Sequence, residues 1–272
     1  MMNPVCSRWA GQGRQVSGKK HQTEAAATIL ECRRVLAANR GTLITEVTGG
    51  LEAADWQRFP EGEGYDPSSH AQFFYHRHPT PAAEAGARAE HGHFHLFLRA
   101  EGVPAGISPL VLPDLAVANA PLSPQSAPAK RGGRDEVCHL VAVALDRRGE
   151  PMRLFTTNRW VTGETWYRAE DVIAMLDAFR LEHSGGSALL NCWLNAIVRL
   201  FQREIAGLLR DRDAAIMAWR HRRRSNGFED PKLEILSSVA VDLDDRLAGG
   251  PALHPVRRPL SRLPRMAEGW GL

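Results

Sequence analysis

Two short runs of alternating aromatic and histidine residues constrain the fold of this chain more than any other feature. The runs cover residues 73–78 and 90–98, and they hold five of the eleven histidines. Because successive side chains of a strand point to opposite faces, this period of two predicts two β-strands. The connector from Pro79 to Glu90 is rich in Pro, Ala and Gly and predicts a loop. We therefore expect an antiparallel strand pair.

The expected pairing gathers the histidines on one face of the sheet. The side chains that would share this face are His76, His78, His91, His93 and His95. In this register His78 lies opposite His91, His76 lies opposite His93, and Phe74 lies opposite His95. The other face of the second strand carries Gly92, Phe94, Leu96 and Leu98, so it should pack against helices. The histidine face should then look away from the main core, into a cleft.

Histidines two residues apart on neighbouring strands are suited to hold a transition metal. Neutral imidazole is a common ligand of zinc and iron, so these five histidines are candidate metal ligands, and Glu90 or Glu164 could add a carboxylate. Because ligation requires neutral imidazole, metal affinity should weaken below a pH of about 6.5. The alternatives are a solvated polar sheet face and a histidine-rich surface that binds metal adventitiously.

A second hairpin is predicted later in the chain. Residues 137–146 and 152–157 are rich in β-branched and apolar residues and flank a glycine turn. His139 would share a face with Val141, Val143 and Leu145, and could join the histidine face as a sixth candidate. A single buried histidine, hydrogen-bonded in the core, is the alternative that we favour.

Outside the two hairpins, the ordered part of the chain is predicted to be mainly helical. Apolar periodicity and capping residues favour helices over the segments 23–39, 169–182, 188–210 and 213–224, whereas 232–247 suits a helix or a strand equally. The segment 49–67 predicts a loop with at most one helical turn. The fold class is therefore α+β, with an antiparallel sheet of two hairpins and helices packed on one face.

The domain limits follow from composition. Residues 1–22 are basic, polar and without period, and are expected to be disordered. Residues 23–248 should form one α+β domain with an exposed insertion at about 119–134. Residues 249–272, rich in Pro and Arg, should form a mobile tail.

A second set of polar residues is a candidate ligand-binding group. The segment from Asn158 to Tyr167 includes two tryptophans with Arg159 and Glu164 around a glycine, which is unusual for a plain connector. Asn195 and Arg199 belong to a polar stripe on an otherwise apolar helix and therefore need partners. Those partners could be the backbone of the 158–167 loop or a bound anion.

Composition excludes several functional classes. No apolar run approaches the length of a membrane span, and no apolar stretch follows the basic N-terminus as in a signal peptide, so a cytoplasmic protein without a membrane partner is expected. The four separated cysteines favour reduced thiols over a zinc ribbon.

The net charge of +3 is mild, and the basic clusters lack interleaved aromatics. Nucleic-acid binding is therefore not expected. The oligomeric state is left open.

Two resemblances add to these inferences. The segments Glu90 to Phe97 and Leu154 to Trp166 resemble an uncharacterised bacterial domain family of unknown function; the likeness spans roughly residues 23 to 248 and implies one domain. The seven residues from His91 to Phe97 also resemble the histidine-triad motif of nucleotide hydrolases and transferases. That resemblance implies His93 as a nucleophile on phosphate, assisted by His91 and His95. Gly92 departs from the motif, and the family's upstream phosphate-binding segment is absent.

Three functional interpretations remain. The first is a metal-dependent enzyme that uses the histidine face, with zinc or iron as the cofactor. The second is a non-catalytic module that binds metal or a small molecule. The third is a phosphate-ester enzyme of the triad type. No dinucleotide fingerprint, Walker loop or serine-hydrolase motif is present in the sequence.

Overall fold

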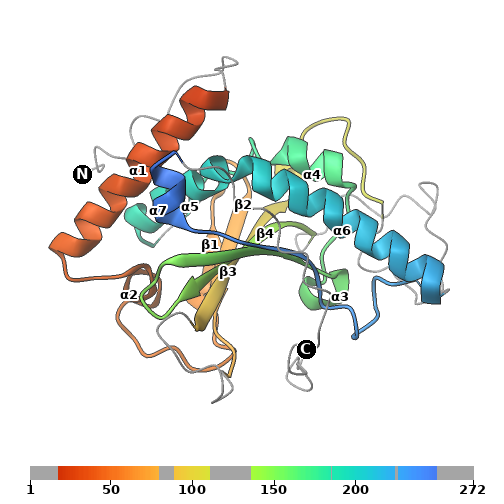
Figure 1. The fold of residues 1–272 in the computed structure, drawn as a ribbon, viewed down its shortest axis with the longest axis horizontal. Helices are drawn as coiled ribbons and strands as arrows, with labels where there is room; N and C mark the ends of the chain where they lie inside the picture. Colours follow the sequence, from red (N-terminus) through yellow and green to blue (C-terminus); the bar gives the residue numbers. More distant parts are fainter. Residues whose placement is uncertain (1–17, 80–88, 111–135, 185, 224–225, 250–272) are drawn as a thin grey trace.

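The two histidine-rich runs form neighbouring antiparallel strands in the computed structural model, which describes residues 18–79, 89–110, 136–184, 186–223 and 226–249. Within these ranges the strands pair in chain order in one six-stranded antiparallel sheet (Figure 1). The strands are β1 (Phe59–Tyr65), β2 (Ala71–His76), β3 (Glu90–Arg99), β4 (Val137–Asp146), β5 (Pro151–Thr157) and β6 (Ile235–Ala240). Each strand therefore pairs with the strand that precedes it, and β2 and β3 lie side by side inside the sheet.

The register between β2 and β3 is the one expected from the sequence. His76 lies opposite His93, and Phe74 lies opposite His95. The alternating pattern fixes this register because a slip of one residue would turn the apolar side chains of β3 away from the core.

One face of the sheet packs against the helices. Phe94, Leu96 and Leu98 of β3 are fully buried in the same core cluster as Trp193 and Ile197. The helices are α1 (Gly18–Ala38), α2 (Leu43–Thr48), α4 (Ala169–Met175), α5 (Ala188–Leu200), α6 (Gln202–Arg223) and α7 (Leu243–Leu247), besides the short α3 (Arg159–Thr162) and the 3-10 turn η2 (Ala100–Gly102). Figure 1 shows α1, α4, α5 and α6 together over the sheet. The α+β class and the apolar face of β3 are thus confirmed.

Several element boundaries differ from the expectation. The segment 49–67 contains β1, and 232–247 resolves into β6 followed by α7. The helix expected over 188–210 ends at Leu200, because Phe201 leaves helical geometry (φ −105°, ψ 21°) and its ring is buried in the core. From Gln202 a separate helix, α6, runs without interruption to Arg223. The sheet is therefore larger than two hairpins.

The ends and the insertion of the chain are described only in part. α1 begins at Gly18, so the expectation of disorder is wrong for residues 18–22. Residues 1–17, the insertion at 119–134 and the tail from residue 250 lie outside the described residues. None of the helices in the described ranges has the length and apolar character needed to cross a membrane.

The cysteines follow the expectation in two described cases. Cys32 and Cys138 are buried free thiols, and burial raises the pKa of the Cys32 thiol to about 12. Cys192 is disulfide-bonded, so the expectation of four reduced thiols is wrong.

The polar stripe on α5 meets a different partner from the one expected. The Asn195 side chain accepts a hydrogen bond from the Leu181 amide at 2.9 Å and donates one to the Leu181 carbonyl at 3.1 Å. Asn191 accepts from the Ser184 hydroxyl at 2.8 Å. The segment that follows α4 therefore satisfies these two amides, in place of the 158–167 backbone or a bound anion.

Candidate metal centre

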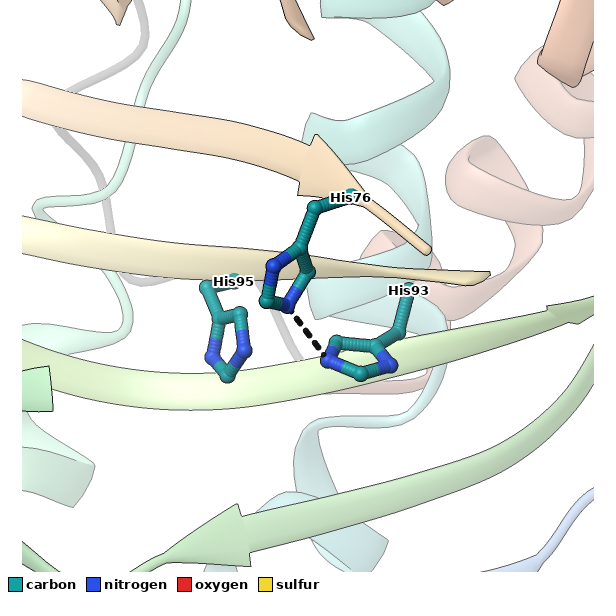
Figure 2. Close-up of side chains that lie close together, drawn as sticks. All are labelled: His76, His93 and His95. Carbon is teal, nitrogen blue, oxygen red and sulfur yellow. Dashed lines mark hydrogen bonds between the residues drawn. The ribbon is translucent and has the colours of Figure 1, made fainter. Parts of the chain in front are cut away.

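Three imidazoles converge on the sheet face opposite the helix-side core. His76 of β2 and His93 and His95 of β3 each offer one ring nitrogen, and these atoms lie within 4.8 Å of one another. The Nε2 atoms of His76 and His93 are 2.8 Å apart. Figure 2 shows the three rings turned toward one another, with the His76–His93 contact dashed. All three residues are buried, so the site is enclosed by its neighbours.

Small residues on the next strand make room for these rings. In the β3–β4 register His93 lies opposite Ala144, and His95 lies opposite Ala142. Both alanines face the same side as Phe155 of β5, with which they form a small buried cluster. The Phe155 ring meets the His93 ring edge-on, with centroids 5.1 Å apart. The imidazoles therefore spread over β4 and are enclosed by an aromatic ring instead of water.

A β-bulge at the start of β3 exchanges Glu90 and His91 between the two faces. Glu90 pairs with Asp146 and Gly92 with Leu145, so His91 is an extra residue in the strand. Its Nδ1 lies 2.6 Å from the Tyr75 hydroxyl, whose ring packs in the helix-side core. The expectation that His91 shares a face with His93 is therefore wrong. A strict period of two does not allow for the extra residue.

The bulge brings Glu90 to His93. The Nδ1 atom of His93 donates to Glu90 Oε1 at 2.7 Å, while Glu90 Oε2 accepts from Arg153 at 2.5 Å. Burial works to raise the pKa of Glu90, but its bonds to His93 and Arg153 outweigh burial and lower that pKa to about 2. Glu90 is thus an ionised acceptor that fixes the His93 ring with Nδ1 protonated and Nε2 directed at His76.

His95 is oriented in a similar way by a histidine from β4. Its Nδ1 lies 3.1 Å from Nε2 of His139, and Nδ1 of His139 lies 3.3 Å from the Thr157 hydroxyl. A second register shift, between Leu96 and Phe97, turns His139 toward the histidine face. The predicted shared face of His139 with Val141 is wrong, because Val141 lies in the helix-side core. His139 nevertheless contacts the cluster through His95, in agreement with its prediction as a sixth candidate.

Four of the clustered histidines have lowered pKa values, which favour the neutral imidazole. Burial lowers the pKa of His76 and of His95, and the neighbouring histidines lower both further. Burial also lowers the pKa of His139 to about 3 and, together with His93, that of His78 to about 4. Neutral imidazoles have a nitrogen lone pair to offer a cation, which protonated imidazoles do not.

His78 lies at the outer side of the cluster. Its ring stacks on His93 with centroids 5.0 Å apart and meets His76 edge-on at 4.6 Å. The residue is half-buried, and Trp56 packs against its other side with centroids 4.2 Å apart. His78 is therefore placed between the buried histidines and the partly exposed Trp56.

The predicted ligand-binding residues are not gathered into one site. Arg159 forms a salt bridge with Glu229. Glu164 accepts from the His139 backbone amide at 2.9 Å and from the Thr162 hydroxyl at 3.3 Å, and burial raises its pKa to about 7. Asn195 and Arg199 belong to α5, on the opposite side of the sheet from the histidines. The contact of Glu164 with the histidine cluster is thus through the backbone amide of His139, whose ring in turn contacts His95.

The comparisons with known proteins give a family and nothing finer. A family model described as a domain of unknown function, DUF6969, matches residues 23–241. No curated protein matches the chain, and no solved structure matches it.

Proposed function

Since the chain belongs to the DUF6969 family, which has no described function, we propose from the site itself that His76, His93 and His95 bind one transition-metal ion, zinc or iron. We propose further that the protein is a metal-dependent enzyme acting on a small molecule. A bound ion of this kind would supply Lewis acidity and lower the pKa of a coordinated water.

The observation that carries this proposal is that His93 and His95 each use their two ring nitrogens for different contacts. His93 and His95 use Nδ1 for Glu90 and His139, which leaves Nε2 of each ring for a common centre. Metal-ligating histidines are held in the same way by an outer carboxylate or another acceptor. A polar sheet face that binds no metal would not explain why three imidazoles converge in a buried site.

The distance between the rings fits a small adjustment on binding. Two nitrogens bound to one tetrahedral ion at about 2.05 Å lie about 3.3 Å apart. The Nε2 atoms of His76 and His93, at 2.8 Å, are hydrogen-bonded to each other. Binding would replace that hydrogen bond and would move the two rings apart by about half an ångström.

The number of ligands favours an enzyme over a closed structural site. Three protein ligands leave a coordination position for water or substrate, whereas structural zinc sites use four. The alternative is a non-catalytic metal-binding or small-ligand module, which His78 would favour if it joined the ion as a fourth ligand. The triad interpretation is weakened, because His91 lies on the opposite face from His93.

Elemental analysis of the protein purified without a histidine tag tests the proposal. We expect close to one zinc or iron ion per chain, and we expect His76→Ala together with His93→Ala to remove it. His221→Ala, an exposed histidine on α6, is the matched control and should retain the metal. A parent protein that is metal-free and also takes up no added zinc or iron would refute the site.

A further inference from the structure

A cavity lies at the opposite end of β2 from His76. β2 begins at Ala71, directly after a turn at residues 66–70, and ends at His76. This turn, η2 and the segment 178–182 after α4 line a cavity of about 450 Å³. That volume is in the range of small-molecule sites. None of the described residues that line the cavity belongs to the proposed metal centre, so this is a separate site.

One buried carboxylate holds two walls of the cavity together. Asp66 is 1% exposed, and its Oδ1 accepts from the Ser68 and Ser69 amides at 2.9 and 3.1 Å. Its Oδ2 accepts from the Glu182 and His183 amides at 2.5 and 2.6 Å. Burial works to raise the pKa of Asp66, but these four bonds outweigh burial and lower it. The turn and the segment after α4 are therefore fixed to each other by an ionised group that needs no further partner.

The third wall, η2, is held against the same turn. The Arg99 amide donates to the His70 carbonyl at 2.9 Å. A Cβ built on Gly102 would lie 2.5 Å from the Ser69 carbonyl oxygen, so only glycine permits this close approach. The Tyr65 hydroxyl lies 2.8 Å from Nδ1 of His70 and holds that ring in place. The cavity is thus formed before any ligand binds, which lowers the entropic cost of binding.

Charged side chains of both signs line this cavity. Arg180 and Glu182 come from the segment after α4, and Glu101 comes from η2. All three residues are exposed, and none of their charged groups forms a hydrogen bond or salt bridge with another described residue. Burial lowers the pKa of Arg199 on α5, the charge of Arg180 lowers it further, and that of Glu182 raises it. Arg180 and Glu182 therefore lie near the same guanidinium and near each other.

We propose that this cavity binds a small zwitterion, whose carboxylate is held by Arg180 and whose ammonium group is held by Glu182 and Glu101. A guanidinium offers a planar set of N–H donors that matches a carboxylate, and ionised carboxylates accept from the three N–H groups of an ammonium ion. An anion alone would face the two glutamates, and a cation alone would leave Arg180 without a counter-ion. The inference does not rest on the proposed metal centre.

Isothermal titration calorimetry with matched probes tests the binding. The ω-amino acids from glycine to 6-aminohexanoate carry both charges at increasing separation, whereas butyrate carries only the negative charge and butylamine only the positive one. We expect the best of the amino acids to bind at least about tenfold more tightly than butyrate and butylamine, because it gains both charged contacts. If no amino acid binds more tightly than the two singly charged probes, the inference is overturned.

Two variants assign the two charges of the ligand. Arg180→Gln should weaken the best amino acid and butyrate by about three- to tenfold without weakening butylamine. Glu182→Gln should weaken the same amino acid and butylamine to a similar extent without weakening butyrate. Both side chains are exposed, so thermal melting should match the parent and exclude a merely structural effect.

A third variant controls for the loss of a surface charge. Arg222→Gln, an exposed arginine on α6, should change none of these affinities. Amino-acid binding that survives both Arg180→Gln and Glu182→Gln, or that Arg222→Gln weakens equally, would overturn the site.

Discussion

At the scale of single residues, the chemistry of the site depends on which ring nitrogen of each histidine is left for a metal. Glu90 decides this for His93, because an ionised carboxylate can only accept, and therefore requires the proton on Nδ1. The sequence made Glu90 a candidate metal ligand but gave no sign that it would orient His93. Its role follows from the extra residue in the strand and from Arg153, which lies 63 positions away and holds the other carboxylate oxygen.

Replacing Glu90 should therefore weaken metal binding without removing a ligand. We expect Glu90→Gln to lower zinc affinity by about ten- to a hundredfold, since the amide can donate as well as accept and no longer fixes the ring. Competition titration against a zinc chelator measures this, with the exposed Glu52→Gln as control. Equal affinities of Glu90→Gln and parent would show that His93 needs no carboxylate.

At the scale of elements, Gly92 permits the bulge that sorts Glu90 and His91. A Cβ built on Gly92 would lie 2.4 Å from the His76 carbonyl oxygen and 2.7 Å from the Tyr75 hydroxyl. Neither the backbone of β2 nor a buried tyrosine can move aside without shifting the strand. Gly92 is therefore required for the close approach of β2 to the bulge.

A pair of glycine variants tests this requirement. Gly92→Ala should destabilise the fold by about 1–3 kcal/mol through overpacking, and should also reduce metal binding because His76 and His93 are displaced. Gly207→Ala on α6, where a Cβ meets nothing within 4 Å, should stabilise by about 0.5–1 kcal/mol. Urea unfolding measures both. A Gly92→Ala variant as stable as the parent would mean that the bulge can relax.

The same scale shows what sequence patterns can predict. The alternation in residues 73–78 and 90–98 predicted β2, β3 and their register, because one face had to be apolar. It could not predict the bulges, which each depend on one unpaired residue and which moved His91 away from the cluster and turned His139 toward it. The partners of Asn191 and Asn195 were missed because a helix was expected over 169–182, whereas α4 ends at Met175 and residues 181–184 lie against α5.

At the scale of the whole molecule, the α+β class and the helix-covered face were predictable from periodicity. The positions of β1 and β6 were not, since Phe59–Tyr65 contains Pro and two Gly residues, and Ile235–Ala240 is short. Such strands form by hydrogen bonding to a neighbouring strand that the sequence pattern does not identify.

The free energy of unfolding should depend on pH because of one buried acid, Glu164. Burial raises the pKa of Glu164 to about 7 despite the nearby Arg212, so the folded state retains a proton that the unfolded chain releases near 4.5. Stability from this group is therefore complete below about pH 4.5 and is lost as pH rises toward 7, by up to about 3 kcal/mol. The Glu164→Gln variant has no group that titrates at this position, so its stability should not show this loss as pH rises.

Denaturant unfolding across pH measures the difference between the two proteins. We expect Glu164→Gln to gain on the parent steadily from pH 5 to pH 8. If the difference stays constant with pH, Glu164 is already ionised in the folded protein and its carboxylate is compensated by its neighbours.

The extra residue at His91 has one more consequence, which concerns parity. A strand assigns odd and even positions to opposite sides, and an insertion inverts that assignment for everything on one side of it. An unbroken strand would add a fourth imidazole to the metal face, a donor set that closes a tetrahedral ion to water. In the proposed site, the inverted parity would place a negative charge outside the ion instead and would leave a coordination position for a reactant. A single unpaired residue would then separate a site that only stores a metal from one that can use it.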